Sequence, residues 1–141
     1  MGESQFRRWH RGFTLLELLV VMVIIGLLAG FVAPKYFAQV GKAESRTAQA
    51  QVQAIKRAIE QYRLDTGHFP TTEAGLAALT SRPPGEKKWT GPYLEKAAPL
   101  DPWERPYVYK SPGDHGDFDL ASYGKDGQPG GSGETADITT W

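Results

Sequence analysis

The first third of the chain separates apolar from charged positions. Residues 18–33 carry no charged side chain, and the apolar run reaches back to Phe13 apart from Thr14 and Glu17. A run of this length approaches the roughly 20 residues that an α-helix needs to cross a bilayer. The pattern therefore predicts a hydrophobic helix over residues 13–35 that meets a membrane.

Three arginines, at positions 7, 8 and 11, precede this run. Positive charge is retained on the cytoplasmic side, so the residues after the run are predicted to lie outside the cytoplasm. A cleaved secretory signal has a similar basic and apolar order, and Ala29, Gly30 and Ala33 could imitate its cleavage site. Because the apolar run passes without a break into a helical pattern, an anchor is favoured over a cleaved signal.

The helical pattern continues through residues 39–64 with one apolar face. Val52, Ile55, Ile59 and Tyr62 recur at helical spacing between charged residues. This stripe is expected to pack against the chain's own sheet rather than form a groove for a partner. Pro34 inside the long helix predicts a kink or local unwinding, since proline removes a backbone donor.

Turn residues divide the remaining sequence into short elements. Gly67 and Pro70 should end the long helix, and Thr71 should cap a second helix that reaches Leu79 with Glu73 in its first turn. Residues 81–100 are predicted to form a long loop anchored by Trp89 and Tyr93. A turn that begins at residue 101 should lead into a strand through residue 109, and residues 118–122 should form a second strand. The fold class is α+β, with a long N-terminal helix packed on a small antiparallel sheet.

Glu17 is the one charge within the apolar run. A carboxylate at membrane depth costs about 3 kcal/mol on insertion scales and usually has a partner. Cleavage between Gly12 and Phe13 would create an α-amino group about one helical turn from Glu17. That amine could pair with Glu17 of the same chain or of a neighbour, where it would set the stagger of packed helices.

The sequence Arg-Gly-Phe-Thr-Leu-Leu-Glu, residues 11–17, resembles the type III signal of type IV pilins and of the pseudopilins of type II secretion. The resemblance implies cleavage after Gly12 by a prepilin peptidase, N-methylation of Phe13 and an assembly role for Glu17. Residues 62–76 are more similar to the major pseudopilin of type II secretion than to a generic pilin. The chain is therefore identified as a member of the type IV pilin-like superfamily.

The resemblance also implies a domain organisation and a set of partners. Residues 1–12 would be a cleaved leader, residues 13–35 the transmembrane and filament-core helix, and residues 36–141 a periplasmic domain. The protein would be a single-pass protein of the bacterial inner membrane that polymerises into a periplasmic helical filament. Expected partners are further copies of the chain, inner-membrane lipid, minor pseudopilins, the prepilin peptidase, an inner-membrane assembly platform with a cytoplasmic ATPase, and an outer-membrane secretin.

Residues 122–138 form a glycine-rich stretch with acidic residues at both ends. Ordering such a loop costs about 1 to 2 kcal/mol per residue, so an ordered loop needs a clamp. Calcium fits by chemistry, because it accepts carboxylate and carbonyl oxygens in irregular geometry, although Asp-Gly alone more often marks a simple turn. The family resemblance implies a calcium site with Asp126, Asp137 and the carbonyl of Tyr123, and with Thr135 and Thr139 as further candidates.

Composition narrows the classes of function. The chain has sixteen basic and sixteen acidic residues and no cysteine, so a disulfide cannot close the C-terminal loop as it does in many type IV pilins. Without residues 1–12 it keeps 13 basic and 15 acidic residues, a net charge of −2, so there is no basic surplus for nucleic acid. The three histidines are scattered, and the sequence has no nucleophile elbow or phosphate loop, so no enzyme is predicted.

The expected function is that of a major pseudopilin whose filament drives folded proteins through the secretin. A type IV pilin used for adhesion or motility is the nearest alternative. A membrane-anchored periplasmic binding module that does not polymerise is an alternative of a different class.

Overall fold

The structure, a computed structural model, describes residues 12–141. The predicted leader therefore lies outside the described residues, apart from Gly12. The chain divides into two compact units, one ending at Ala38 and one comprising Gln39–Trp141, and each is described by itself.

Helix α1, Leu15–Thr66, begins in the first unit and ends in the second. It is helical at every residue, so the local unwinding expected near Pro34 is not found. In the first unit all side chains of residues 12–32 are exposed, Leu15 by 87%. A helix that is apolar all round is stable only when lipid or other apolar surfaces cover it.

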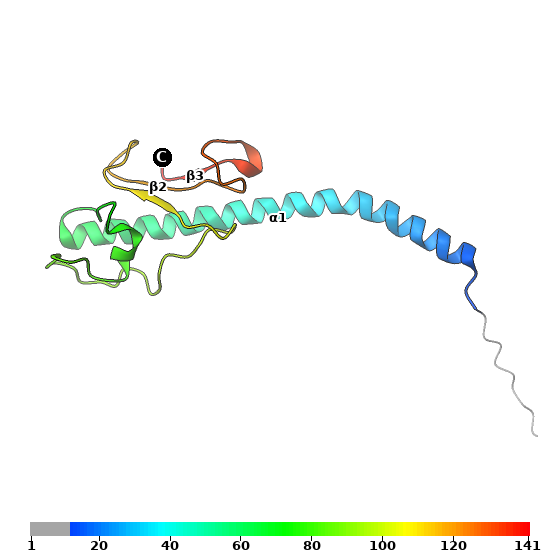
Figure 1. Ribbon diagram of the computed structural model, residues 1–141, viewed down its shortest axis with the longest axis horizontal. Helices are drawn as coiled ribbons and strands as arrows, with labels where there is room; N and C mark the ends of the chain where they lie inside the picture. Colours follow the sequence, from blue (N-terminus) through cyan, green and yellow to red (C-terminus); the bar gives the residue numbers. More distant parts are fainter. Residues whose placement is uncertain (1–11) are drawn as a thin grey trace, which may run out of the picture. The chain divides into compact units, whose positions relative to one another are not determined.

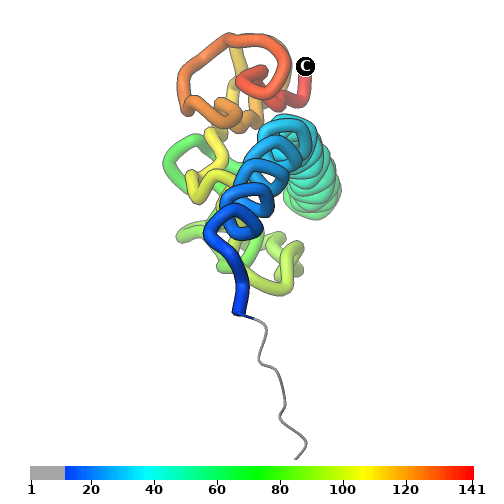
Figure 2. The backbone as a smooth tube through the Cα atoms, turned by 90° about the vertical axis from the view of Figure 1, so that its right-hand side faces the viewer, coloured from blue at the N-terminus to red at the C-terminus, as the bar shows by residue number. Residues whose placement is uncertain are grey.

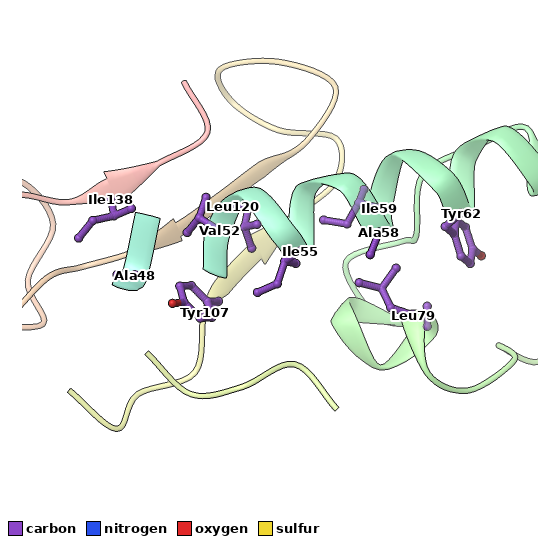
Figure 3. Close-up of a cluster of buried hydrophobic side chains, with 11 residues drawn as sticks. Ala48, Val52, Ile55, Ala58, Ile59, Tyr62, Leu79, Tyr107, Leu120 and Ile138 are labelled. Carbon is purple, nitrogen blue, oxygen red and sulfur yellow. The ribbon is translucent and has the colours of Figure 1, made fainter. Parts of the chain in front are cut away.

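The second half of α1 supplies one side of the core of the second unit. Val52, Ile55, Ile59 and Tyr62 are almost completely buried, as the helical spacing predicts. Figure 3 shows these side chains directed toward residues contributed by the other elements, namely Leu79, Tyr107, Leu120 and Ile138. The stripe on α1 is thus a contact within the unit, as predicted.

Three short strands form the sheet of the second unit. They are β1 (Val108–Lys110), β2 (Asp119–Ser122) and β3 (Ile138–Thr139). The central strand β2 is antiparallel to both neighbours, with Tyr109 opposite Leu120 and Ser122 opposite Ile138. The two predicted strands are present but shorter than expected, and β3 was not predicted. Figure 1 shows β2 and β3 on one side of the second half of α1, with the green segment around the 3₁₀-helix η1 (Gly75–Leu79) on the other. Figure 2 shows the backbone of the same unit from the side, turned by 90°.

The end of α1 follows the prediction. Gly67 adopts a φ of 87°, and its amide donates to the carbonyl of Arg63 over 2.7 Å. A left-handed residue just past the last turn is a common helix stop, and glycine adopts it without strain. The expected second helix is wrong in its type and start: it is the 3₁₀-helix η1, Gly75–Leu79, with no acidic residue in its first turn. Thr71 still caps the preceding turn, since its hydroxyl accepts the amide of Ala74.

Residues 81–100 form the irregular segment that was predicted, and it is fixed to the core by aromatic side chains. The indole of Trp89 donates to the carbonyl of Ala78 over 2.8 Å and meets the ring of Tyr93 edge-on. Tyr93 in turn meets the ring of Tyr62 on α1. A second tie joins the same segment to the residues that follow α1, where Nε2 of His68 lies 2.7 Å from Oε2 of Glu86.

A tight turn connects this segment to the sheet, and Asp101 organises it. The buried carboxylate of Asp101 accepts the amides of Trp103 and Arg105 through Oδ1 and the hydroxyl of Ser122 through Oδ2. Glu104 within the turn has a φ of 63°, the single positive value among the described non-glycine residues. A side chain in this left-handed region costs about 1 to 2 kcal/mol.

The end of the chain is built into the fold. Beyond β3 the amide of Thr140 donates to the carbonyl of Leu120 over 3.1 Å. The indole of Trp141 stacks on the ring of His115 with their centroids 4.1 Å apart, and Nδ1 of that histidine lies 2.9 Å from the carboxylate of Asp119. Trp141 therefore packs against the loop between β1 and β2.

The tie between His68 and Glu86 predicts a pH-dependent stability. The Phe69 carbonyl above all, and also Glu86, raise the pKa of His68 above 6.5, against the lowering by partial burial. A raised folded-state pKa adds stability that is complete below 6.5 and is lost as pH rises through the folded-state pKa. The melting temperature of wild type minus that of His68→Gln should therefore shrink between pH 6 and 8.5. A difference that stays constant or grows over this range would contradict the assignment, and Glu86→Gln should retain part of the pH dependence because Phe69 remains.

The backbone of Glu104 predicts a stabilising substitution. Glu104→Gly should raise stability by about 0.5 to 1 kcal/mol, or a few degrees in melting temperature, because the strain relieved exceeds the added freedom of the unfolded chain. The matched control is Glu95→Gly, an exposed glutamate in the preceding segment without a positive φ. That control should be neutral or destabilising. Equal shifts for the two variants, measured by thermal unfolding, would refute the strain argument.

Candidate functional sites

The start of α1 is closed by a reciprocal pair of hydrogen bonds between Thr14 and Glu17. The Thr14 hydroxyl accepts the amide of Glu17 over 3.2 Å, while Oε2 of Glu17 accepts the amide of Thr14 over 2.9 Å. This is a capping box, in which a threonine and a glutamate three residues later satisfy amides that the first helical turn leaves free. The negative charge of Glu17 also lies at the positive end of the helix dipole.

Sequence reasoning missed this role of Glu17. The sequence led to the expectation that the Glu17 carboxylate pairs with an α-amino group, whereas in the structure it accepts the amide of Thr14. The spacing Thr-x-x-Glu directly before an apolar run was the signal that could have found the cap. Gly12 and Phe13 precede the helix in a segment without regular secondary structure, and both are exposed, with Phe13 84% accessible. The proposed cleavage position is therefore outside α1.

The glycine-rich loop lies between β2 and β3 and contains the short 3₁₀-helix η2, Gly133–Thr135. Asp126 is exposed, and its Oδ1 accepts the amide of Gln128 over 3.0 Å. Asp137 is half-buried, and its Oδ2 accepts the amide of Gly130 over 2.8 Å. Each carboxylate thus folds the loop back on itself, and each retains oxygen lone pairs.

The loop has two limbs, one that follows β2 and carries Tyr123 to Asp126, and one that precedes β3 and carries Thr135 to Asp137. These limbs approach each other at Gly124. A Cβ atom built on this glycine would lie 2.7 Å from the carbonyl oxygen of Ala136 and 3.0 Å from that of Thr135. Tyr123, next to this crossing, accepts the amide of Gly127 with its carbonyl and lines a cavity of about 390 Å³ together with Asp137. The structure therefore brings Tyr123 and Asp137 to one cavity, while Asp126 belongs to the turn that follows Tyr123.

One atom of Asp137 has no partner. Its Oδ1 is buried and lacks a hydrogen-bond donor, the single such side-chain atom within residues 12–141. A buried anionic oxygen without a partner is costly, so its environment suits a cation. Among the described residues no three His, Cys, Asp or Glu side chains gather as a metal cluster. Two carboxylates with main-chain carbonyls form a hard oxygen set, which suits calcium better than a transition metal.

The two threonines have other hydrogen-bond partners. The hydroxyl of Thr135 donates to the carbonyl of Ser132, and that of Thr139 donates to the carbonyl of Trp141. Donating these protons leaves the oxygen lone pairs able to bind a cation, although Oγ1 of Thr135 also accepts the amide of Ser132 over 3.3 Å. The main-chain carbonyl of Thr135 faces Gly124 at the crossing of the limbs.

Two further residues that fix the loop were not predicted. Arg105 donates to the carbonyls of Gly124 and Lys125 over 2.7 and 3.0 Å. Glu134 lies against Gly41 of α1, where a Cβ atom would come within 2.7 to 3.0 Å of its carboxyl group, and it pairs with Lys125 at 3.5 Å. Both contacts join segments far apart in sequence, so spacing gave no signal for them.

Comparison with known families yields two matches that together span nearly the whole chain. Residues 35–141 match the family described as Type II secretion system (T2SS), protein G. Residues 10–33 match the prokaryotic N-terminal methylation motif. The second match contains Gly12, Phe13 and the Thr14–Glu17 capping box.

Individual proteins give the same result. The chain is 43% identical to type II secretion system core protein G of Pseudomonas aeruginosa over 96% of this chain and 97% of that protein. It is 44% identical to the core protein G of Vibrio cholerae over 95% of this chain and 93% of that protein. The crystal structure of the major pseudopilin from the type 2 secretion system of enterohaemorrhagic Escherichia coli matches with a TM-score of 0.63 and 33% identity, covering 74% of this chain and 92% of that structure.

Proposed function

The chain belongs to the type II secretion system protein G family, and from this premise we propose that it works as the major pseudopilin of such a system. Its role is structural: copies of the chain add to a periplasmic filament that drives folded proteins through the outer-membrane secretin. The observation that carries the proposal is the joint match of the globular part and of the methylation motif, on a chain whose helix α1 is exposed throughout its apolar first part, residues 15–32.

The apolar half of α1 would lie first in the inner membrane and later in the core of the filament. In the inner membrane, lipid would cover side chains such as Leu15, Leu19 and Phe31, which all lie more than half exposed in the single chain. The helix is long and apolar enough to cross a bilayer, and none of its apolar window is buried by the protein itself. In the filament, the same side chains would be covered by helices of neighbouring copies, while the second unit remains in the periplasm.

Processing would convert the capping box into an assembly contact. Cleavage between Gly12 and Phe13 by a prepilin peptidase, followed by N-methylation, would place a cationic amine at Phe13, beside the segment that Thr14 and Glu17 close. The cap gives the Glu17 carboxylate a hydrogen-bond donor while it lies in the bilayer, which reduces the cost of its burial. In the filament the amine of one copy would neutralise Glu17 of the next and set the register of the helices.

The remaining partners follow from the proposed role. Minor pseudopilins, an inner-membrane platform and a cytoplasmic ATPase that supplies the energy would work with the filament. The second unit would present its periplasmic surface to neighbouring copies. Because the chain keeps a net charge of −2 after processing, nucleic acid is not proposed as a partner.

We also propose that the loop between β2 and β3 binds calcium. Asp126, Asp137 and the carbonyl of Tyr123 would hold the ion, with the carbonyl of Thr135 close to the same crossing. The unpartnered Oδ1 of Asp137 supports this choice. Bound calcium would supply positive charge that ties the two limbs together, and so perform the clamping that a disulfide performs in other small exported domains.

The filament role predicts fibres that depend on Glu17. Overproduction of the chain with the other components of its secretion system should yield surface fibres visible by electron microscopy. Glu17→Ala should abolish them while the protein remains in the membrane fraction, because anchoring needs the apolar run and register needs the charge. Glu60→Ala, which removes an exposed glutamate from the second half of α1, is the matched control and should leave assembly intact.

Mass spectrometry of the membrane-extracted protein completes that test. The mature chain should begin with N-methylated Phe13. An intact leader in cells that secrete normally would overturn the proposal. Fibres that support motility without secretion would favour a type IV pilin, and a lasting monomer that binds a ligand would favour a periplasmic binding module.

The calcium role predicts metal-dependent melting. Wild type in calcium should unfold at a higher temperature than in chelator, by an amount equivalent to about 2.7 kcal/mol when free calcium is one hundred times the dissociation constant. Asp126→Ala and Asp137→Ala should each lose most of this difference. Asp117→Ala, an exposed aspartate outside the loop, should retain it. Identical melting of wild type with and without chelator would count against a calcium site.

A further inference from the structure

Arg105 connects the turn at residues 101–105 to the first limb of the glycine-rich loop. Both hydrogen bonds of its guanidinium group go to main-chain carbonyls of that limb, through Nη1 to Gly124 and through Nη2 to Lys125. Gly127 leaves space for the group: a Cβ atom there would lie 2.6 Å from Cζ of Arg105. The planar fork of arginine can bind two adjacent carbonyls at once, which an ammonium group cannot reproduce.

The position of Arg105 is itself fixed by hydrogen bonds. Its amide donates over 2.8 Å to Oδ1 of Asp101, whose other oxygen accepts the hydroxyl of Ser122 over 2.6 Å. The oxygen of Ser122 accepts the amide of Gly124 over 3.3 Å. A closed circuit of hydrogen bonds therefore runs from Asp101 to the loop along two routes, one through Arg105 and one through Ser122.

This circuit selects among the carbonyls that could face a cation. The carbonyls of Gly124 and Lys125 lie against the cationic guanidinium group, which disfavours a second cation there, whereas the carbonyl of Tyr123 accepts a 3.2 Å bond from the neutral amide of Gly127. A carbonyl oxygen has two lone pairs, so Tyr123 keeps capacity for a ligand bond. The same circuit fixes the backbone that leads to Asp126.

We propose that Arg105 is a positioning residue for the calcium site, which orders the limb that carries Tyr123 and Asp126 before the ion binds. This inference rests on the proposed calcium binding. A limb that is ordered in advance loses less conformational freedom on binding, so calcium binds more tightly than to a loop that must be ordered by the ion alone. The positive charge of Arg105 acts in the opposite direction, since it repels calcium. Removal of Arg105 should therefore weaken calcium binding if the ordering of the limb dominates, and strengthen it if charge repulsion dominates.

The experiment measures calcium affinity and local order in the full chain, purified in detergent. Calorimetric titration should show that Arg105→Ala binds calcium at least tenfold more weakly than wild type. Arg105→Lys should fall between the two, because one ammonium cannot hold both carbonyls. Arg82→Ala is the matched control, since Arg82 likewise donates to a main-chain carbonyl, that of Trp89, away from the loop. Its calcium affinity should equal that of wild type.

Hydrogen exchange in chelator gives a readout that needs no calcium. Wild type should protect the amide of Gly127, and Arg105→Ala should lose that protection. The amide of Gly124, which still donates to Ser122, and the core amides of β2 should stay protected. If the alanine variant fails to fold, the lysine variant decides both measurements. Calcium affinity of Arg105→Ala equal to or tighter than wild type would overturn the inference.

The two proposals fail in different ways. If wild type binds calcium, Asp126→Asn and Asp137→Asn do not, and Arg105→Ala binds as wild type does, the calcium site stands and the role of Arg105 is refuted. If wild type itself binds no calcium, the site is refuted and the positioning role falls with it.

Discussion

The buried stripe on the second half of α1 is the interaction on which the globular unit depends. Val52, Ile55 and Ile59 are at most 1% exposed, and each such side chain contributes about 1.5 to 3 kcal/mol on burial. The strands β1, β2 and β3 are only two to four residues long, too short to be stable as an isolated sheet. They persist because Tyr107, Leu120 and Ile138 pack into the same cluster as the helix (Figure 3).

The first half of α1 is apolar but exposed, because no other part of residues 12–141 covers it. Its side chains can be satisfied by lipid or by apolar helices of other copies, and both surroundings are equally free of water. Within this stretch Glu17 is the polar exception, and the capping box meets its need for hydrogen-bond donors locally. A carboxylate that accepts hydrogen bonds within its own chain costs less to bury than a bare one.

The sequence was a reliable guide at the long periodic stripe and at the glycine that ends α1, but not after Thr71 or at Pro34, where the expected helix type and the expected unwinding are wrong. The stripe from Val52 to Tyr62, the stop at Gly67 and the anchoring role of Trp89 were predicted from spacing and residue type, and the structure confirms them. Strand β3 was missed because two residues are too few for an alternating pattern, and their pairing with β2 is decided by a partner about sixteen residues away.

The candidate calcium site was harder to predict, because several of its contacts join residues that are far apart in the sequence. The aspartates at the ends of the loop were visible as residue types, and the family resemblance gave them a role. Arg105 and Glu134 act across long separations, on Gly124 and Gly41, and no local rule connects those positions. The glycines at these contacts could be read as turn residues or helix weak points, whereas the structure shows them as places where a side chain would collide.

The stacking of Trp141 on His115 has a practical meaning for anyone who handles this protein. Trp141 stacks on a ring of the globular unit and residues 1–12 are expected to be removed, so a label or purification handle at either position would disturb a contact or be lost. A peptide fused after Trp141 would have to start from an indole held against a neighbouring ring and beside the edge of β3. The exposed stretch Glu95-Lys96-Ala97 is a safer place for such an insertion, because all three side chains face solvent and the stretch belongs to no strand or helix.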